Sequence, residues 1–433
     1  MILRRAVRFA AAIGWALVPL ATAWGQTVDV ERPSLLVVGT PSLRTASAAL
    51  NDAPPGASAT RLPSGRLRIG WRASLGMSVE HAPVLDAQGN IYVVGERGDV
   101  VALSPTGEEL WRLATNFAQP GPSTVLRDGT IVFVDGSGAA VAVREGFLRW
   151  RTKLARGDSA RPHPLALDDG GVIVAAGNAI VVLDAEGHER ARLVLSETAA
   201  SILAAEPNQI AVVTTNGTVW TWNPGALEPT RVASLDASID ATPALGNGHV
   251  LFAIAAGGSR LFAADLVTGS VSLRASATGS LWVSSPVVQR ETVSLLALAA
   301  GGEVALALDG RGGEIGQAWI GSSPLPVMDG GVGLRSAIPQ APLLADSEGT
   351  LAFAAADGAL GVVAHLGSSQ PEVQRISDPC PAPAGGRAAI DSAVVGITPL
   401  RPGAFLAVCR RGTLLAIQGE SPGIDGVGGV GHE

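Results

Sequence analysis

Short apolar runs and turn residues alternate along the chain from Pro83 to Gln418. The clearest copy of the pattern runs from Ala82 to Gly95 and continues from Gly98 to Trp111. It contains four segments of strand length, separated by Gly, Asp and Asn residues that favour turns. This pattern predicts a sheet of four short antiparallel strands as the basic unit.

The unit recurs eight times, and a Pro or Ala marks the start of each copy: Pro83, Pro122, Pro164, Ala204, Pro243, Pro286, Pro342 and Pro399. Successive spacings are 39, 42, 40, 39, 43, 56 and 57 residues. The first five match a propeller blade of about 40 to 45 residues, and the last two match a blade with an inserted loop. The repeat predicts an all-β, eight-bladed β-propeller, with seven blades as the alternative if the weak copy from Ile202 to Leu235 is misread.

The two ends of the repeat region predict how the ring closes. The eighth copy stops after three strands, whereas residues 66–74 before the first copy look like a fourth strand without its preceding three. We expect this N-terminal strand to complete the last blade, because closure leaves no exposed sheet edge at the junction. The predicted propeller therefore spans residues 65–418.

The segments outside the propeller indicate export. Arg4, Arg5 and Arg8 precede an apolar run from Phe9 to Ala23, and the small residues Ala23 and Gly25 suit a signal peptidase. We predict a signal peptide at 1–25, a flexible leader rich in Ala, Pro and Ser at 26–64, and a disordered Gly-rich tail at 419–433. The mature protein is expected in the periplasm or outside the cell, without a transmembrane segment.

Charge and cysteine content narrow the function classes. The net charge of −7 becomes −10 when the three arginines of the predicted signal peptide are removed, and an acidic surface argues against nucleic-acid binding. Cys380 and Cys409 are the only cysteines. In an exported chain such a pair favours a disulfide, with two buried thiols as the alternative. No Cys lies near the predicted cleavage site, so the sequence does not predict a lipid anchor.

The segment from Val101 to Arg112 resembles the Ala-x-Asp-x-x-Thr-Gly-x-x-x-Trp signature of pyrroloquinoline-quinone-type (PQQ-like) propeller repeats. Weaker matches begin at Phe262 and Val182. The resemblance covers nearly all of residues 65–418. It implies that tryptophans of the outer strands dock between adjacent blades, and the residues at that place are Trp71, Trp111, Trp150 and Trp319.

Two subclasses of this family differ in function. Its quinoprotein dehydrogenases hold the quinone and calcium in the central channel and commonly carry adjacent cysteines, which this chain lacks. No Cys-x-x-Cys-His motif for an attached haem occurs either. The chain is closer in character to the cofactor-free BamB-like propellers, the accessory subunits of the outer-membrane β-barrel assembly machinery. Those subunits are usually lipoproteins, so the missing lipobox Cys counts against that specific role.

The remaining candidate residues favour a structural role over a catalytic one. His81 and His163 precede two inner strands, but no third ligand is fixed by spacing, so no metal site is predicted. Asp86 and Asp128 lie in turns, where Asp is favoured for its geometry. Two Pro/Gly-rich insertions, 322–340 and 367–396, adjoin the closing blades. We predict that they rim a partner surface formed with Glu80, His81, Arg161, His163, Asp240 and Trp282.

The resulting hypothesis is an exported, monomeric, non-catalytic propeller that acts as a scaffold for an envelope or secreted protein, with no cofactor. A PQQ- and calcium-dependent oxidoreductase is the first alternative. A secreted glycan-binding or hydrolytic propeller is the second, although no spacing of carboxylates places a catalytic pair. Saturable binding of quinone and Ca²⁺ distinguishes the first alternative, and retention on polysaccharide distinguishes the second.

Overall fold

The computed structural model describes most of the chain beyond residue 56. The described ranges are 57–58, 60–117, 119–154, 161–205, 209–224, 226–239, 241–277, 280–299, 301–321, 342–355, 357–380 and 393–420. All of them fall within one compact unit of the chain. Within these ranges every regular element is a β-strand.

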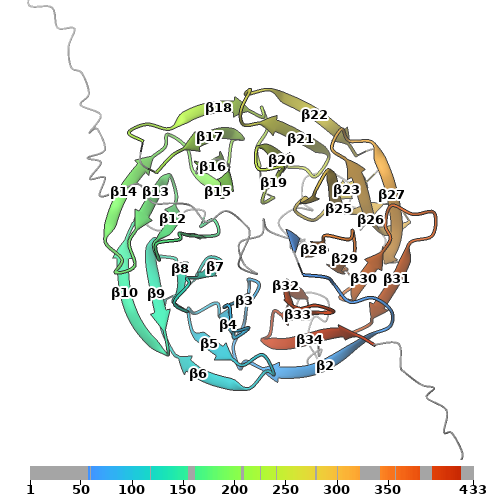
Figure 1. Cartoon of the computed structure of the whole chain (residues 1–433), viewed down its shortest axis with the longest axis horizontal. Coiled ribbons are helices and arrows are strands. Elements are labelled where there is room, and N and C mark those ends of the chain that lie inside the picture. The colour runs from blue at the N-terminus through green and yellow to red at the C-terminus, as the bar shows by residue number, and fades with distance from the viewer. Residues whose placement is uncertain are drawn as a thin grey trace, which may run out of the picture. The chain divides into compact units, whose positions relative to one another are not determined.

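Eight sheets surround a central channel, and each is a blade whose strands A to D run from the channel outward (Figure 1). The A strands are β3 (Val84–Leu85), β7 (Ser123–Val125), β11 (Leu165–Ala166), β15 (Ala199–Ala205), β19 (Ala244–Gly246), β28 (Leu343–Asp346) and β32 (Val394–Arg401). In blade 6 the A position is divided between β23 (Ser280–Trp282) and β24 (Val287–Gln289), which both pair with β25.

The middle strands of each blade are almost entirely buried, as sheets covered on both faces require. The B strands are β4 (Ile91–Val94), β8 (Ile131–Val134), β12 (Val172–Ala176), β16 (Gln209–Thr214), β20 (Val250–Ile254), β25 (Thr292–Ala299), β29 (Leu351–Ala354) and β33 (Ala404–Cys409). The C strands are β5 (Val100–Leu103), β9 (Ala139–Arg144), β13 (Ala179–Leu183), β17 (Thr218–Trp222), β21 (Arg260–Asp265), β26 (Gly302–Asp309), β30 (Leu360–Ala364) and β34 (Thr413–Gly419).

The outer strands carry most of the polar and exposed residues. They are β6 (Glu109–Leu113), β10 (Phe147–Lys153), β14 (Glu189–Val194), β18 (Thr230–Ser234), β22 (Val271–Ser276), β27 (Glu314–Gly321), β31 (Glu372–Ile376) and β2 (Leu67–Ser74). The eight-bladed prediction is confirmed. The weak fourth copy forms the complete blade β15 to β18, so the seven-bladed alternative is wrong.

The N-terminal strand closes the ring as predicted. β2 pairs antiparallel with β34 from Leu67 opposite Gly419 to Ser74 opposite Thr413, and so supplies strand D of blade 8. A bulge between Ile69 and Trp71 interrupts the register. The sheet of the last blade therefore joins both ends of the propeller by backbone hydrogen bonds.

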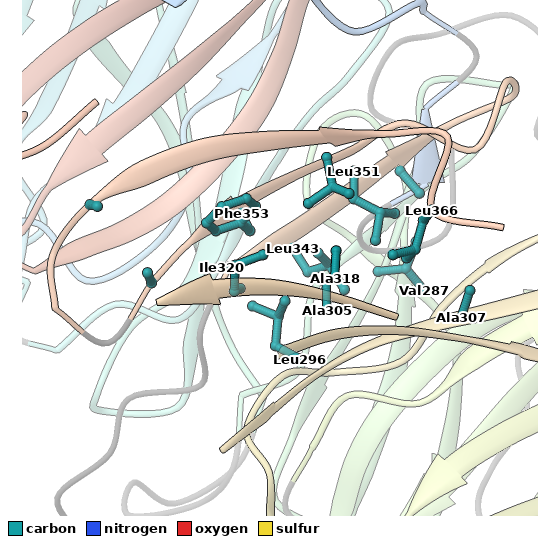
Figure 2. Close-up of a cluster of buried hydrophobic side chains, with 14 residues drawn as sticks. Val287, Leu296, Ala305, Ala307, Ala318, Ile320, Leu343, Leu351, Phe353 and Leu366 are labelled. Carbon is teal, nitrogen blue, oxygen red and sulfur yellow. The ribbon is translucent and has the colours of Figure 1, made fainter. Parts of the chain in front are cut away.

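The hydrophobic core is divided into eight clusters, and each cluster lies between two neighbouring blades. Figure 2 shows the cluster between blades 6 and 7, where Leu296 and Ile320 face Leu343 and Phe353. Each blade buries its apolar side chains against its two neighbours. Blades 1 and 8 therefore cover each other's apolar faces only when the ring is closed.

Three of the four tryptophans assigned to blade docking touch a glycine of the next blade. A methyl group on Gly107 would lie 2.7 Å from Trp71 Cε3, and one on Gly187 would lie 2.5 Å from Trp150 Cδ2. Trp111 lies over Gly146 at a looser 3.7 Å. All three glycines have positive φ, so they provide both the conformation of the turn and the space for the tryptophan side chain.

Trp319 has a different position, which corrects the role predicted for it. In blade 6 the outer strand has two bulges, and the first falls at Ile315, so the residue that follows it, as Trp111 follows the bulge of β6, is Gly316. Trp319 is three residues farther along, is 56% exposed, and lies over Gly301 of its own blade. The bulge sets the register and so decides which side chain reaches the next blade.

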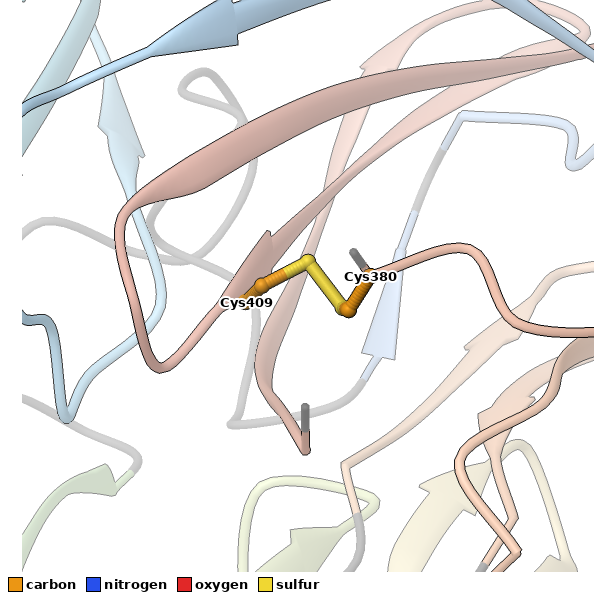
Figure 3. Close-up of a disulfide and its surroundings, with 2 residues drawn as sticks. All are labelled: Cys380 and Cys409. Carbon is orange, nitrogen blue, oxygen red and sulfur yellow. A yellow bond between two sulfur atoms is a disulfide. The ribbon is translucent and has the colours of Figure 1, made fainter. Parts of the chain in front are cut away.

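A disulfide joins Cys380, which follows the outer strand of blade 7, to Cys409 in strand B of blade 8 (Figure 3). Both cysteines are buried in the cluster between these two blades. The bond closes a loop of 29 residues of sequence separation. Such a loop closure contributes about 3 kcal/mol to stability. The predicted disulfide thus ties blade 7 to blade 8, the blade that the closing strand β2 completes.

The first predicted insertion, 322–340, lies outside the described residues, whereas of the second, 367–396, only residues 381–392 do. The first connects β27 to β28, and the second connects β31 to β32. The second segment is not an insertion throughout, because its residues Glu372–Ile376 form β31, the outer strand of blade 7. Both connections run from a D strand to an A strand and therefore begin and end on one face of the ring.

Candidate functional site

The alternating strand directions give the ring two faces. Connections from strand D to the next strand A lie on the same face as the B–C turns, because their backbones are hydrogen-bonded to each other: Val79 N donates to Arg410 O at 2.7 Å and Gln119 N donates to Glu96 O at 2.9 Å. We call this the D–A face. The A–B and C–D turns form the opposite face, which we call the A–B face.

Four of the six predicted partner residues come together on the D–A face. Glu80 and His81 lie in the connection from β2 to β3, and Arg161 and His163 lie in the connection from β10 to β11. Arg161 packs over Gly121 of the intervening connection, where an added methyl group would lie 2.8 Å from its Cβ. Two D–A connections therefore carry these side chains, and Gly121 of the connection between them lies under Arg161.

Two residues missed by the sequence analysis extend this group. Arg410 Nη1 lies 3.4 Å from Glu80 Oε1 and 3.9 Å from Glu96 Oε1. Glu80 and Arg410 are 330 positions apart in the sequence and meet only because the ring closes. The two missed residues, Glu96 and Arg410, lie in B–C turns. In each turn the charged residue comes directly before an Arg-Gly pair, and this is the one sequence signal that the two share. We define the D–A cluster as Glu80, His81, Glu96, Arg161, His163 and Arg410.

Each histidine of the D–A cluster is hydrogen-bonded to a backbone carbonyl. His81 Nε2 lies 3.1 Å from Pro120 O, and His163 Nδ1 lies 2.8 Å from Pro164 O. Since a carbonyl only accepts, these ring nitrogens carry the hydrogen in the neutral form. Burial lowers the pKa of both histidines below the ordinary value of 6.5. His163 and Arg161 further lower the pKa of His81, whereas Pro120 O and Glu80 oppose the shift.

These shifts predict a pH-dependent stability. The unfolded histidines take up protons below their ordinary pKa of 6.5, but the folded ones resist protonation because their pKa is lowered. The unfolded state thus binds more protons, and stability falls as the pH decreases from 7.5 to 5.5. We expect the double variant His81→Asn/His163→Asn to lose much of this slope in melting temperature. A slope equal to that of the wild type would contradict the assignment.

An aromatic and cationic pair adjoins the D–A cluster. The Arg151 guanidinium carbon lies 4.9 Å from the ring centroid of Phe117, and Arg151 Nη2 donates to Asp135 Oδ2 at 2.7 Å. Asp135 is buried, and its pKa is lowered because the hydrogen bonds from Ser137 and Arg151 outweigh the opposing effect of burial. Phe117 and Arg151 thus present a fixed cation–π pair beside the charged group.

Two predicted residues do not join this surface. Trp282 is only 7% exposed and packs in the cluster between blades 5 and 6. A large aromatic ring at that position contributes more by sealing the blade interface than by facing solvent. Asp240 lies outside the described residues.

The described residues contain no group of three or more His, Cys, Asp or Glu side chains arranged to hold a metal ion. The turn aspartates bind their own turns: Asp86 Oδ1 accepts from Gln88 N and Asn90 N at 2.9 Å. The part of the chain that the structure describes also contains no helix with the length and hydropathy of a membrane span.

Comparisons with known proteins agree with this architecture. A family model described as outer membrane protein assembly factor BamB matches residues 58–143, from the N-terminal strands to strand C of blade 2. The crystal structure of BamB from Moraxella catarrhalis superposes with a TM-score of 0.57 at 18% identity, covering 81% of this chain and 99% of that one. The chain has the PQQ-like β-propeller fold.

A computationally designed protein has a similar fold. The computationally designed Ika8 protein superposes on the PQQ-like propeller with a TM-score of 0.57 at 16% identity, covering 80% of this chain and 98% of that one. No curated protein matches the sequence. At these identities the structural likeness defines the fold, and function has to be argued from the side chains.

Proposed function

We propose that this chain is an exported, non-catalytic propeller that binds another protein of the cell envelope through its D–A face. The observation that carries the proposal is the D–A cluster, in which two D–A connections and the B–C turns of blades 1 and 8 place two carboxylates, two arginines and two histidines together. Mixed charges beside an aromatic–arginine pair are typical of protein interfaces, where Arg and aromatic residues act as anchors.

The family match supports the envelope setting, because the model is described as outer membrane protein assembly factor BamB, and the Moraxella catarrhalis structure carries the same name, BamB. The predicted signal peptide agrees with that setting. A partner surface of this kind needs no catalytic residue and no cofactor. Its specificity would come from the order of charges, since like charges facing each other across an interface disfavour wrong partners.

Capture from an envelope extract tests the proposal with two charge-neutral variants. The face variant Glu96→Lys/Arg161→Glu reverses two charges of the D–A cluster. The control Glu145→Lys/Arg401→Glu makes the same exchange in turns of the opposite face. We expect the wild type and the control to capture the same partner, and the face variant to retain at least tenfold less. Equal capture by all three proteins would refute the proposal.

A further inference from the structure

Residues 57–58 of the predicted leader form a short strand at the inner edge of blade 7. β1 (Ala57–Ser58) pairs in parallel with β28, with Ala57 opposite Ala345 and Ser58 opposite Asp346. Figure 1 shows this short strand beside β28 at the inner end of blade 7. Among the described strands, β28 is the only A strand that is paired on its channel side. Residues 57–58 and 60–64 therefore differ from the flexible leader predicted for them.

Three contacts hold the following residues on the A–B face. Leu62 N donates to Asp346 Oδ2 at 2.8 Å in the A–B turn of blade 7, and Gly403 N donates to Arg61 O at 2.9 Å in that of blade 8. Arg61 also pairs with Glu348. The Leu62 side chain is 2% exposed and packs in the cluster between blades 7 and 8.

Asp346 is used differently from its counterpart in blade 1. Both aspartates accept two backbone N–H groups of their own turn at Oδ1. Oδ2 of Asp86 accepts from side chains of its own blade, Asn90 and Tyr92, at 2.8 Å. Oδ2 of Asp346 accepts instead from the leader backbone at Leu62. Blade 7 thus offers a buried carboxylate to a peptide N–H that is not part of the blade.

The geometry points to a peptide-binding site, in which the inner edge of β28, Asp346, Glu348 and the pocket of Leu62 accept an extended segment by strand addition. Leader residues 57–58 and 60–62 are its intramolecular occupant. In this recognition mode the backbone supplies the pairing and side-chain pockets supply the specificity. The fitting ligand is an extended peptide with small residues along β28, followed by a basic residue and a leucine. This site lies apart from the D–A cluster and is independent of the proposed function.

The extent of the pairing favours exchange with a competing peptide. Among the described residues of the leader, two are in register with β28, and one large apolar side chain, that of Leu62, packs in the cluster between blades 7 and 8. The intramolecular occupant has the advantage of a high effective concentration, since only four residues lie between Leu62 and Leu67, where β2 begins. A trace of free peptide therefore binds detectably only when the leader is weakened, whereas a large excess also competes with the wild-type leader.

Binding of a fluorescein-labelled peptide with the sequence of residues 53–66 tests the site by fluorescence anisotropy. We expect no saturable binding to the wild-type protein, saturable binding to Leu62→Asp, and at least tenfold weaker binding to Leu62→Asp/Asp346→Asn. A peptide of the same composition in scrambled order is the control. A folded Leu62→Asp protein that binds neither peptide would overturn the proposal.

A second measurement applies if Leu62→Asp does not fold. Unlabelled peptide in large excess is expected to accelerate amide hydrogen exchange at residues 60–66 of the wild-type protein, because it competes for the site. Exchange in the closing strand β2 serves as the internal control and is expected to stay unchanged. Leader exchange that does not respond to the peptide, or to a tenfold higher concentration of it, would overturn the proposal.

Discussion

Removal of residues 1–74 is expected to abolish the cooperative thermal unfolding of the propeller. This deletion takes away β2, which pairs with β34 over seven residue pairs and contributes Leu67 and Trp71 to the clusters on both sides of blade 8. Without β2, blade 8 exposes an unpaired strand edge, and blade 1 loses its apolar contacts with this strand. Near-UV circular dichroism during heating measures the transition.

The matched control removes residues 1–56 only and keeps both N-terminal strands. Both variants need the same added export signal, so that the disulfide between Cys380 and Cys409 forms in each. We expect the control to melt within about 2 °C of the wild type, the shift produced by a change of less than about 1 kcal/mol in a large domain. A sharp transition at the wild-type temperature in the longer deletion would show that β2 does not close the ring.

Truncation of Trp150 is expected to destabilise the propeller by about 3 kcal/mol, the lower end of the range for loss of a large aromatic side chain. Its ring packs on Gly187 of blade 3, and its Nε1 donates to Ala185 O at 2.9 Å. Trp150→Ala loses both contacts between blades 2 and 3. Chemical denaturation followed by tryptophan fluorescence measures the change.

Trp319→Ala is the matched control for this experiment. Trp319 lies on the outer strand of blade 6, is 56% exposed and touches its own blade, so its truncation is expected to cost less than about 0.5 kcal/mol. Gly187→Ala provides an independent check, because the added methyl group would meet the Trp150 ring at a residue with φ of 83°. Equal effects of the two tryptophan truncations would contradict the docking geometry.

The fold was predictable because propeller blades repeat their local chemistry. Pro83 and Trp111 keep the same spacing as Pro122 and Trp150, so two markers set one register. Closure by residues 66–74 followed from counting strands. The strand β1 was not predictable, since it has two residues and its partner β28 lies far along the chain. Nothing in the leader sequence distinguishes a paired Ala-Ser from an unpaired one.

The candidate site was predictable only in part. The D–A connections pointed to His81 and His163 because inner strands begin near the channel. The ion pairs of Arg410 with Glu80 and Glu96 depend on ring closure, and no local pattern reports it. Trp282 was misplaced because a residue at the start of an inner strand was expected to lie on the partner surface, whereas it packs between two blades. Burial is decided by the neighbouring blade, which a single repeat does not specify.

Crosslinking in cells tests the central claim, that the D–A face binds a protein partner, most directly. A photoreactive phenylalanine analogue is placed at Glu96 or Arg161 on this face, and at Glu145 or Arg401 on the opposite face. The account predicts the same crosslinked partner from both positions of the D–A face and none from the other two. A partner crosslinked only from Glu145 and Arg401 would contradict it.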